Sequence, residues 1–270
     1  MPSTFNARDA DSYERLMGRW SRRLAPLLIE HAGVKAGERV LEVGCGTGSL
    51  TFTLAETVDL AQLIAIDYAD VYVEAARARN RDPRIHIERG DATALRFPDA
   101  QFDRALALLV LHFVSDPENA LREMRRVTRP GGVVAGAVWD SGGGMTATRM
   151  FWDTAAVLDP VAAEGRGRAM AKAVTAPGGL ARVFREAGLT QVEERSLLIR
   201  MDHEHFNDYW QPLLTGEGPI GAYVARLDEA ARARLEEHLR AAYLAGAADG
   251  PRSFTAVAWS CRGVVPTDGA

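Results

Sequence analysis

The chain has 270 residues, 47% of them apolar, and a formal net charge of −4 at pH 7. This composition suits one large domain, or one domain with insertions, and excludes wholesale disorder. The acidic balance argues against a nucleic-acid groove, which needs clustered lysine and arginine. Two cysteines, Cys45 and Cys261, are too few for a four-cysteine zinc site and suggest no disulfide framework. Residues 1–11 lack a signal-peptide pattern, and the longest apolar run is too short to cross a bilayer, so a cytoplasmic location is expected.

The first predicted element is a helix that begins at Ser12 and ends near Gly33. From residue 39 to residue 139, short apolar strands then alternate with helices. The predicted strands are 39–43, 63–66, 85–88, 102–111 and 133–139, and the predicted helices are 50–56, 71–80 and 117–127, the last ended by Pro130-Gly131-Gly132. This alternation is typical of a doubly wound α/β sheet. The continuous apolar run at 102–111 favours a strand that is buried on both faces of a parallel sheet.

The regular alternation stops after Trp139, where Ser141 and three glycines predict a loop. The rest of the chain is predicted to contain helices at 151–158, 180–187 and 229–243 and strands at 192–201 and 254–261. The final strand is expected at the edge of the sheet.

A glycine-rich turn, Glu42 to Gly48, joins the first strand to the next helix. Glycines allow a tight turn and a close ligand, and the helix N-terminus presents free N–H groups. Asp67 ends the second strand and could accept both hydroxyls of a ribose, while Asp91 ends the third and could accept from a purine amine. In open α/β sheets ligands bind at these carboxyl ends. The alternative is that both aspartates only cap the helices that follow them.

These segments resemble a class I S-adenosylmethionine-dependent methyltransferase of the small-molecule type, similar to the group of ubiquinone and menaquinone biosynthesis C-methyltransferases. The resemblance rests on 40–48, Asp67-Tyr68, Gly90-Asp91-Ala92, the stretch from Phe102-Asp103 to Leu111-His112, and 129–132. It implies a Rossmann-like, doubly wound, seven-stranded mixed sheet whose last strand is antiparallel. It also implies one methyltransferase domain over residues 1–270, with a lid helix at 11–32 and substrate-covering helical insertions at 141–176 and 203–248.

The resemblance implies that S-adenosylmethionine is the cofactor and that its binding set is Glu42, Gly44, Cys45, Gly46, Asp67, Tyr68, Tyr72, Gly90, Asp91, Ala92 and Leu108. Gly44 and Gly46 would contact the methionine part and Asp67 the ribose. Tyr68 would lie against the adenine, and Asp91 would accept from its amine. The backbone of Leu108 would meet the methionine amine. Two positions depart from the family pattern near the adenine: Ala69 replaces a serine or asparagine, and Tyr72 replaces a methionine.

The candidate catalytic group is His112, which follows the fourth strand and could serve as a base or make a purely structural hydrogen bond. The aromatic residues Trp139, Trp152 and Trp210 could line an acceptor pocket or pack as core. No metal is expected, since His203 and His205 with Asp208 make a poor closed site. An exposed polar turn explains them instead.

The predicted function is transfer of a methyl group to an oxygen, carbon or nitrogen atom of a small, partly apolar molecule. The expected partner is this acceptor, with no nucleic acid and no membrane insertion; a homodimer is left open. One rival is a cofactor-binding regulator without catalysis. The other is a nicotinamide-dependent oxidoreductase, whose fingerprint would need a third glycine where the chain has Ser49.

Overall fold

The computed structural model describes residues 5–267, so the ends of the predicted domain, 1–4 and 268–270, lie outside the described residues. Its sheet has seven strands: β1 (Arg39–Val43), β2 (Gln62–Asp67), β3 (Ile85–Arg89), β4 (Phe102–Leu108), β5 (Thr128–Trp139), β6 (Thr190–His203) and β7 (Arg252–Val264). They lie in the order β3-β2-β1-β4-β5-β7-β6. The first five strands run parallel, and β7 runs antiparallel to both β5 and β6. The predicted Rossmann-like mixed sheet is confirmed.

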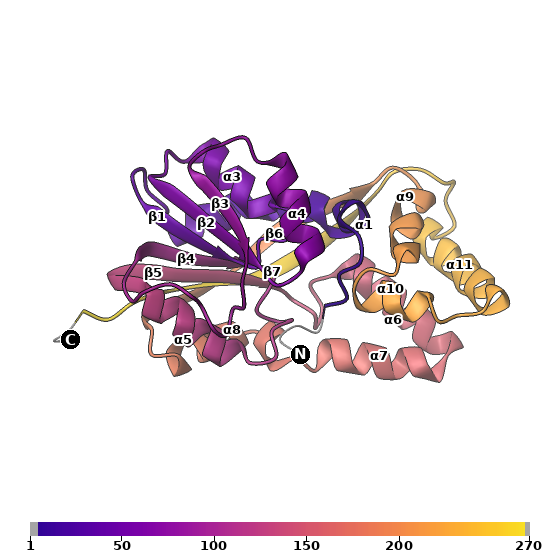
Figure 1. Ribbon diagram of the computed structural model, residues 1–270. Helices are drawn as coiled ribbons and strands as arrows, with labels where there is room; N and C mark the ends of the chain where they lie inside the picture. Colours follow the sequence, from indigo (N-terminus) through magenta and orange to yellow (C-terminus); the bar gives the residue numbers. More distant parts are fainter. Residues whose placement is uncertain (1–4, 268–270) are drawn as a thin grey trace.

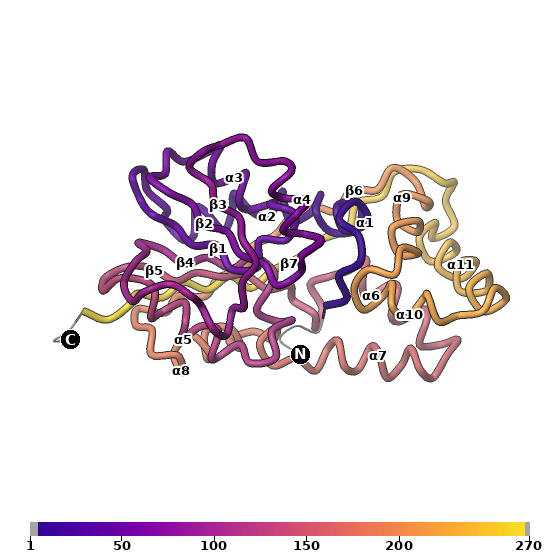
Figure 2. The backbone as a smooth tube through the Cα atoms, in the orientation of Figure 1, coloured from indigo at the N-terminus to yellow at the C-terminus, as the bar shows by residue number. Residues whose placement is uncertain are grey.

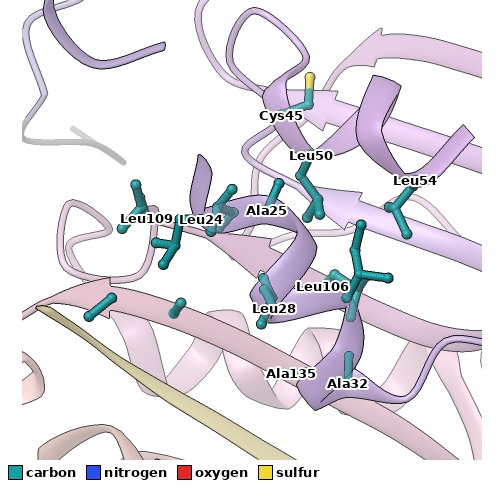
Figure 3. Close-up of a cluster of buried hydrophobic side chains, with 14 of the residues drawn as sticks. Leu24, Ala25, Leu28, Ala32, Cys45, Leu50, Leu54, Leu106, Leu109 and Ala135 are labelled. Atoms are coloured by element: carbon teal, nitrogen blue, oxygen red, sulfur yellow. The ribbon is translucent and has the colours of Figure 1, made fainter. Parts of the chain in front are cut away.

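Helices cover both faces of this sheet (Figure 1). One face carries α2 (Arg19–Ala32), α3 (Ser49–Thr57) and α4 (Asp70–Arg79), and the other carries α5 (Pro117–Val127) and α8 (Gly179–Glu186). Successive strand side chains point to opposite faces, so Val40 of β1 packs with the first group and Leu41 with the second. Figure 3 shows Leu24 and Leu28 of α2 among these buried side chains, near Leu106 of the sheet.

A separate group of helices lies beyond one end of the sheet (Figures 1 and 2). It contains α6 (Thr146–Leu158), α7 (Pro160–Met170), α9 (Phe206–Trp210), α10 (Gly218–Val224) and α11 (Glu229–Leu244). Short 3₁₀ turns occupy Ala173–Thr175 and Gln211–Thr215. These helices come from two distant parts of the chain and share an aromatic core that includes Phe151, Trp210 and Tyr243. Within the described residues, no helix combines the length and apolarity needed to span a bilayer.

The chain enters through α1 (Ala10–Tyr13), followed by a π-helical turn, Glu14–Gly18, that runs directly into α2. A π-turn inserts one extra residue per turn, and such turns occur often at functional sites. The single helix predicted from Ser12 is therefore interrupted by a change of pitch. Gly33 ends it in the left-handed conformation, as expected.

Three predicted strand positions differ from the structure. The strand predicted at 102–111 ends at Leu108, because Leu109 adopts a positive φ of 62° and the chain turns. Pro130-Gly131-Gly132 lies within β5 and not before it, since β5 starts at Thr128 and its pairing with β4 shifts near that point. The last strand, β7, is not at the edge. It lies between β5 and β6, and β6 forms the edge.

A buried ion pair ties the amino-terminal side of the sheet together. Arg104 of β4 donates from Nη2 to Oε1 of Glu38 at 2.9 Å and also donates to the carbonyl oxygen of Ala32. Both side chains are nearly inaccessible, at 9% and 12% exposure. The pair therefore joins β4, the turn before β1 and the end of α2.

We expect Arg104→Met to lower the free energy of unfolding by roughly 3–5 kcal/mol, because it leaves the Glu38 carboxylate buried without its partner. The exposed i,i+4 pair of Arg122 and Glu118 supplies the matched control, and Arg122→Met should cost less than about 1 kcal/mol. Urea unfolding of both variants measures the difference. Equal losses of unfolding free energy in the two variants would show that the buried pair stabilises the fold no more than the exposed pair does.

Candidate functional site

The turn after β1 brings backbone N–H groups to the carboxyl end of β2. Gly44, Gly46 and Gly48 all have positive φ, at 76°, 53° and 93°. A Cβ on Gly44 would lie 2.2 Å from the side chain of Val110, so a larger residue would not fit there. The N–H groups of Gly44 and Cys45 both donate to the carbonyl oxygen of Ile66, at 2.7 and 2.9 Å. The turn is thus held against the next strand.

The carboxylate of Asp67 connects this turn to the start of α4. Its Oδ2 accepts from the N–H of Gly46 at 2.8 Å, and its Oδ1 accepts from the N–H of Ala69 at 2.9 Å. Burial raises the pKa of Asp67, while the backbone N–H groups oppose that rise. Asp67 is not the N-cap of α4, which is Ala69. Each oxygen has a lone pair left for a ligand hydroxyl.

Asp91 follows the end of β3 close to the end of β2, because Asp67 pairs with Arg89, two residues before Asp91. Its Oδ1 accepts from the N–H and the hydroxyl of Thr93 at 2.9 and 2.7 Å, which fixes the carboxylate. No α-helix directly follows Asp91 in the structure, so the capping alternative fails here too. A Cβ on Gly90 would come within 2.8 Å of the Ile66 side chain, so Gly90 is required for close packing.

The other predicted cofactor residues surround this edge. Glu42 is 1% exposed, and its Oε2 accepts from the hydroxyl of Thr51 on α3 at 2.6 Å. Burial, with a smaller contribution from the charge of Asp67, raises the pKa of Glu42 to about 8. The remaining positions range from buried to exposed: Cys45 and Leu108 are buried, Ala92 is partly buried against the α5 side of the sheet, and Tyr68 is exposed.

The N-terminal helix packs directly on the glycine turn. A Cβ on Gly46 would lie 3.7 Å from the ring of Tyr13, and the Tyr13 and Tyr72 ring centroids are 4.9 Å apart. Glu14 accepts a hydrogen bond from the hydroxyl of Thr47. The side chains of α1 and the π-turn therefore form a wall over the turn, at the start of the segment expected to be a lid helix.

Glu217, at the start of α10, joins three segments that are distant in the sequence. Its Oε1 accepts from the N–H groups of Arg8 and Asp9 at 2.8 and 2.6 Å, and its Oε2 accepts from the hydroxyl of Tyr72 at 2.9 Å. The side chain is fully buried. Burial and the Glu217 carboxylate raise the pKa of Tyr72, which keeps its hydroxyl protonated. We call this arrangement the Glu217 clasp.

A cavity of about 570 Å³ lies between the end of the sheet and the helical group. Two of the predicted substrate residues line it: Trp139, the last residue of β5, and Trp152 of α6. The third, Trp210, does not line it and packs in the core of the helical group, stacked with Phe206 at a ring distance of 6.3 Å. Tyr209 and Tyr223 line the cavity instead.

His112 also lines the cavity and is almost fully buried. Lys172 donates from Nζ to its carbonyl oxygen at 2.6 Å. Burial, and secondly the charge of Lys172, lower the pKa of His112 to about 3, so the imidazole is neutral at neutral pH. Its Nδ1 is buried and has no hydrogen-bond partner among residues 5–267.

The other two candidate histidines have structural contacts. Nδ1 of His203 lies 3.2 Å from Nη2 of Arg19, and Nδ1 of His205 accepts from the N–H of Asp208 at the start of α9. In the part of the chain that the structure describes, no group of three or more His, Cys, Asp or Glu side chains is placed to hold a metal ion.

Comparison with known proteins matches residues 41–136 to the family described as "Methyltransferase domain". The ubiquinone/menaquinone biosynthesis C-methyltransferase UbiE of Bdellovibrio bacteriovorus is 38% identical over 109 residues, which are 40% of this chain and 46% of that protein. The 27-O-demethylrifamycin SV methyltransferase of Amycolatopsis mediterranei is 34% identical over 131 residues, 47% of this chain and 46% of that protein. The chain therefore spans less than half the length of these curated relatives.

Among solved structures, the fold is similar to that of the Haemonchus contortus phosphoethanolamine N-methyltransferase 2 in complex with S-adenosyl-L-methionine. The TM-score is 0.60 at 16% identity, and the match covers 96% of this chain and 57% of that one. At this identity the likeness concerns the fold alone.

The raised pKa of Glu42 predicts a specific pH dependence of stability. An acid that is protonated in the folded state contributes stability that declines as pH rises from its unfolded pKa, near 4.5, to its folded value, near 8. Glu42→Gln keeps a group that can accept from Thr51 but does not titrate. Relative to the wild type, its stability should rise with pH over this range, with a slope of up to about 1.4 kcal/mol per pH unit.

Thermal melts from pH 5 to pH 9 measure this effect, and Glu56→Gln on the exposed side of α3 is the matched control. A difference between Glu42→Gln and wild type that is independent of pH would contradict a protonated Glu42.

The Glu217 clasp predicts the protection of two backbone amides. Glu217→Ala should speed the hydrogen exchange of the Arg8 and Asp9 amides by roughly tenfold to a hundredfold, since hydrogen bonds to a charged acceptor contribute about 1.5–3 kcal/mol. Tyr72→Phe removes only the third bond and should leave both amides protected. Exchange measured by NMR or mass spectrometry decides this. If both variants behave alike, Glu217 does not hold the N-terminal segment.

Proposed function

Because residues 41–136 form a class I methyltransferase domain of the ubiquinone and menaquinone C-methyltransferase type, we propose that the protein transfers a methyl group from S-adenosylmethionine to a small, partly apolar acceptor. One observation carries the proposal. The glycine turn, Asp67 and Asp91 stand at three neighbouring strand ends, and a cavity lined in part by aromatic side chains lies at the ends of β4 and β5 in the same sheet.

The residues at this edge fit the cofactor. A ribose needs a carboxylate with free lone pairs, and Asp67 is held by backbone N–H groups that leave such lone pairs open. An adenine amine needs an acceptor, and Oδ2 of Asp91 has no hydrogen-bond partner in the described part of the chain. The methionine part needs close approach to the backbone, which Gly44 and Gly46 permit.

In this proposal Asp67 holds the ribose, Asp91 holds the adenine amine, and Gly44, Gly46 and the backbone of Leu108 hold the methionine part. When bound, S-adenosylmethionine supplies a methyl group already activated by a positively charged sulfur. Methyl transfer then requires the chain to align the acceptor and exclude water. Tyr13 and Tyr72 stand over the glycine turn and would do the second of these.

We assign acceptor binding to the cavity and its covering segments, 11–32, 141–176 and 203–248. Trp139 and Trp152 give it flat apolar walls, as small-molecule pockets commonly have. The helices from the two later segments share one core, so they would cover the acceptor as a unit. Trp210 belongs to that core, and its role is to support the cover.

His112 enters the proposal as a neutral group on the cavity wall. A neutral imidazole can accept a proton, but burial and Lys172 disfavour the protonated form that would result. His112 is therefore a weak base. The acceptor atom should be one that needs little help to lose its proton, or one that carries none.

The cofactor site is tested by Asp67→Ala. Loss of the carboxylate should weaken binding of S-adenosylhomocysteine by roughly 2–4 kcal/mol, because two hydrogen bonds to a charged acceptor are removed. The matched control is Asp70→Ala, which removes an exposed carboxylate three residues away whose ion-pair partner is Arg89. Isothermal calorimetry measures both variants, with NAD as a second ligand that should not bind.

Unchanged affinity in a folded Asp67→Ala protein would remove the ribose assignment. Tight binding of NAD without S-adenosylhomocysteine binding would overturn the cofactor. Turnover is read as S-adenosylhomocysteine release in an acceptor screen. Cofactor binding without release on any acceptor would favour a non-catalytic regulator.

A further inference from the structure

Arg19 of α2, paired with Asp208, is one positive side chain that lines the cavity, and five others form a group that we call the cationic wall. These five come from α6, α7 and the segment just after α7, with one more at the end of α10: Arg149, Arg166, Arg168, Lys172 and Arg226. Among the described residues that line the cavity, the one carboxylate is that of Glu217. It already accepts from two backbone N–H groups and a tyrosine hydroxyl. The positive side chains on this wall therefore outnumber the carboxylates that pair with them.

The ion pairs on this wall do not neutralise its excess positive charge. Arg149 and Arg166 share a single carboxylate, that of Asp153, each at 3.1 Å. Arg168 pairs with Glu164 on the exposed side of α7, at 3.5 Å. Lys172 and Arg226 have no carboxylate within 4.0 Å in the described part of the chain. Of these two, Arg226 is exposed and Lys172 is half-buried.

Lys172 has the environment of an incomplete binding site. Its ammonium donates to the carbonyl oxygen of His112 at 2.6 Å and lies 4.8 Å from the ring centroid of Phe113. An ammonium has three donors, so this contact leaves others available. Burial without a counter-ion disfavours the charge and lowers the pKa of Lys172. An anionic oxygen next to Nζ would offset that cost.

The rest of the cavity lining is mostly apolar, although Arg19, His203 and Glu217 also contribute to it. Trp20, Trp139, Met145, Met201 and Leu213 line the cavity together with the ring of Tyr209. Such side chains suit a flat or aliphatic body, and Glu217 is the one carboxylate among the described lining residues. The cationic wall and the apolar walls bound one continuous space, and His112, next to Lys172, stands just beyond the end of β4.

We propose that the methyl acceptor is an amphipathic anion, with an apolar body and a carboxylate or similar anionic oxygen, and that Lys172 binds the anionic group. This rests on the proposed function, because it places the acceptor in the cavity beside the cofactor edge. Lys172 is thus the specificity-determining residue of the acceptor site.

The chain has two lysines, Lys35 and Lys172, which makes a direct footprint feasible. The protein saturated with S-adenosylhomocysteine is acetylated with acetic anhydride in the presence of 2-naphthoate or of its uncharged counterpart 2-naphthamide. We expect 2-naphthoate to slow acetylation of Lys172 by about tenfold or more, because an ion-paired amine is protonated and shielded. Lys35 is the internal reference and should react equally under all conditions.

Substitutions of Lys172 test whether the charge of its side chain or only its shape determines binding. Lys172→Met should weaken 2-naphthoate binding, followed by tryptophan fluorescence, by about tenfold or more and leave 2-naphthamide unchanged. Lys172→Arg should restore most of the preference for the anion, and Lys35→Met is the matched control. Equal binding of the two probes, or equal protection by them, would overturn the inference.

The cofactor measurement keeps this test distinct from that of the proposed function. If S-adenosylhomocysteine does not bind in calorimetry, the proposed function fails whatever the probes do. If it binds and itself protects Lys172, the lysine contacts the cofactor and the inference is wrong while the function stands. Protection by 2-naphthoate and by inorganic phosphate alike would assign the site to a small anion alone and overturn the amphipathic acceptor.

Discussion

Two backbone N–H groups converge on the carboxylate of Asp67, and the arrangement of the whole carboxyl edge depends on them. Gly46 and Ala69 donate from separate turns, so one side chain sets the position of the turn after β1 and the turn after β2. The geometry requires positive φ at Gly44 and Gly46, which points successive N–H groups toward β2. Asp67 is also the side chain best placed to bind a ribose. In the proposed function, Asp67 would therefore both hold the two turns in place and bind the ribose.

The Glu217 clasp connects this edge to the cavity. Glu217 lines the cavity, while its carboxylate bonds Tyr72 on α4 and the backbone at Arg8 and Asp9. Tyr72 in turn packs against Tyr13, which lies over Gly46. A chain of direct contacts thus runs from the acceptor side to the glycine turn.

The two halves of the site differ in the charge of their side chains. The ends of β2 and β3 carry Asp67 and Asp91, whose carboxylates suit the hydroxyls and the amine of the proposed cofactor, while Glu42 is buried nearby with a raised pKa. The opposite wall carries arginines and Lys172, and its charge exceeds that of its acids. Burial makes both halves sensitive to unpaired charge, as the raised pKa of Glu42 and the lowered pKa of His112 show.

The sequence alone predicts the strands and helices between residues 39 and 139. It also predicts the glycine turn and the two aspartates at strand ends. These features are local: alternation of apolar residues, glycine at positive φ and the chemistry of one side chain at a time. The pattern could not place β7 between β5 and β6, because its alternating burial suits an inner strand and an edge strand equally well. Nor could it distinguish Trp152, which lines the cavity, from Trp210, which does not, since both are aromatic residues on helices.

The contacts of Glu217 and Lys172 could not be predicted from the sequence pattern either. Glu217 bonds residues 145 and more positions away, and Lys172 meets a carbonyl 60 positions away. Such contacts depend on how separate helices pack on the sheet, and a single polar residue in a helical segment reads as solvent-exposed until that packing is known. Local sterics and periodicity thus account for the cofactor edge, whereas the acceptor cavity and the charge on its wall arise from long-range packing.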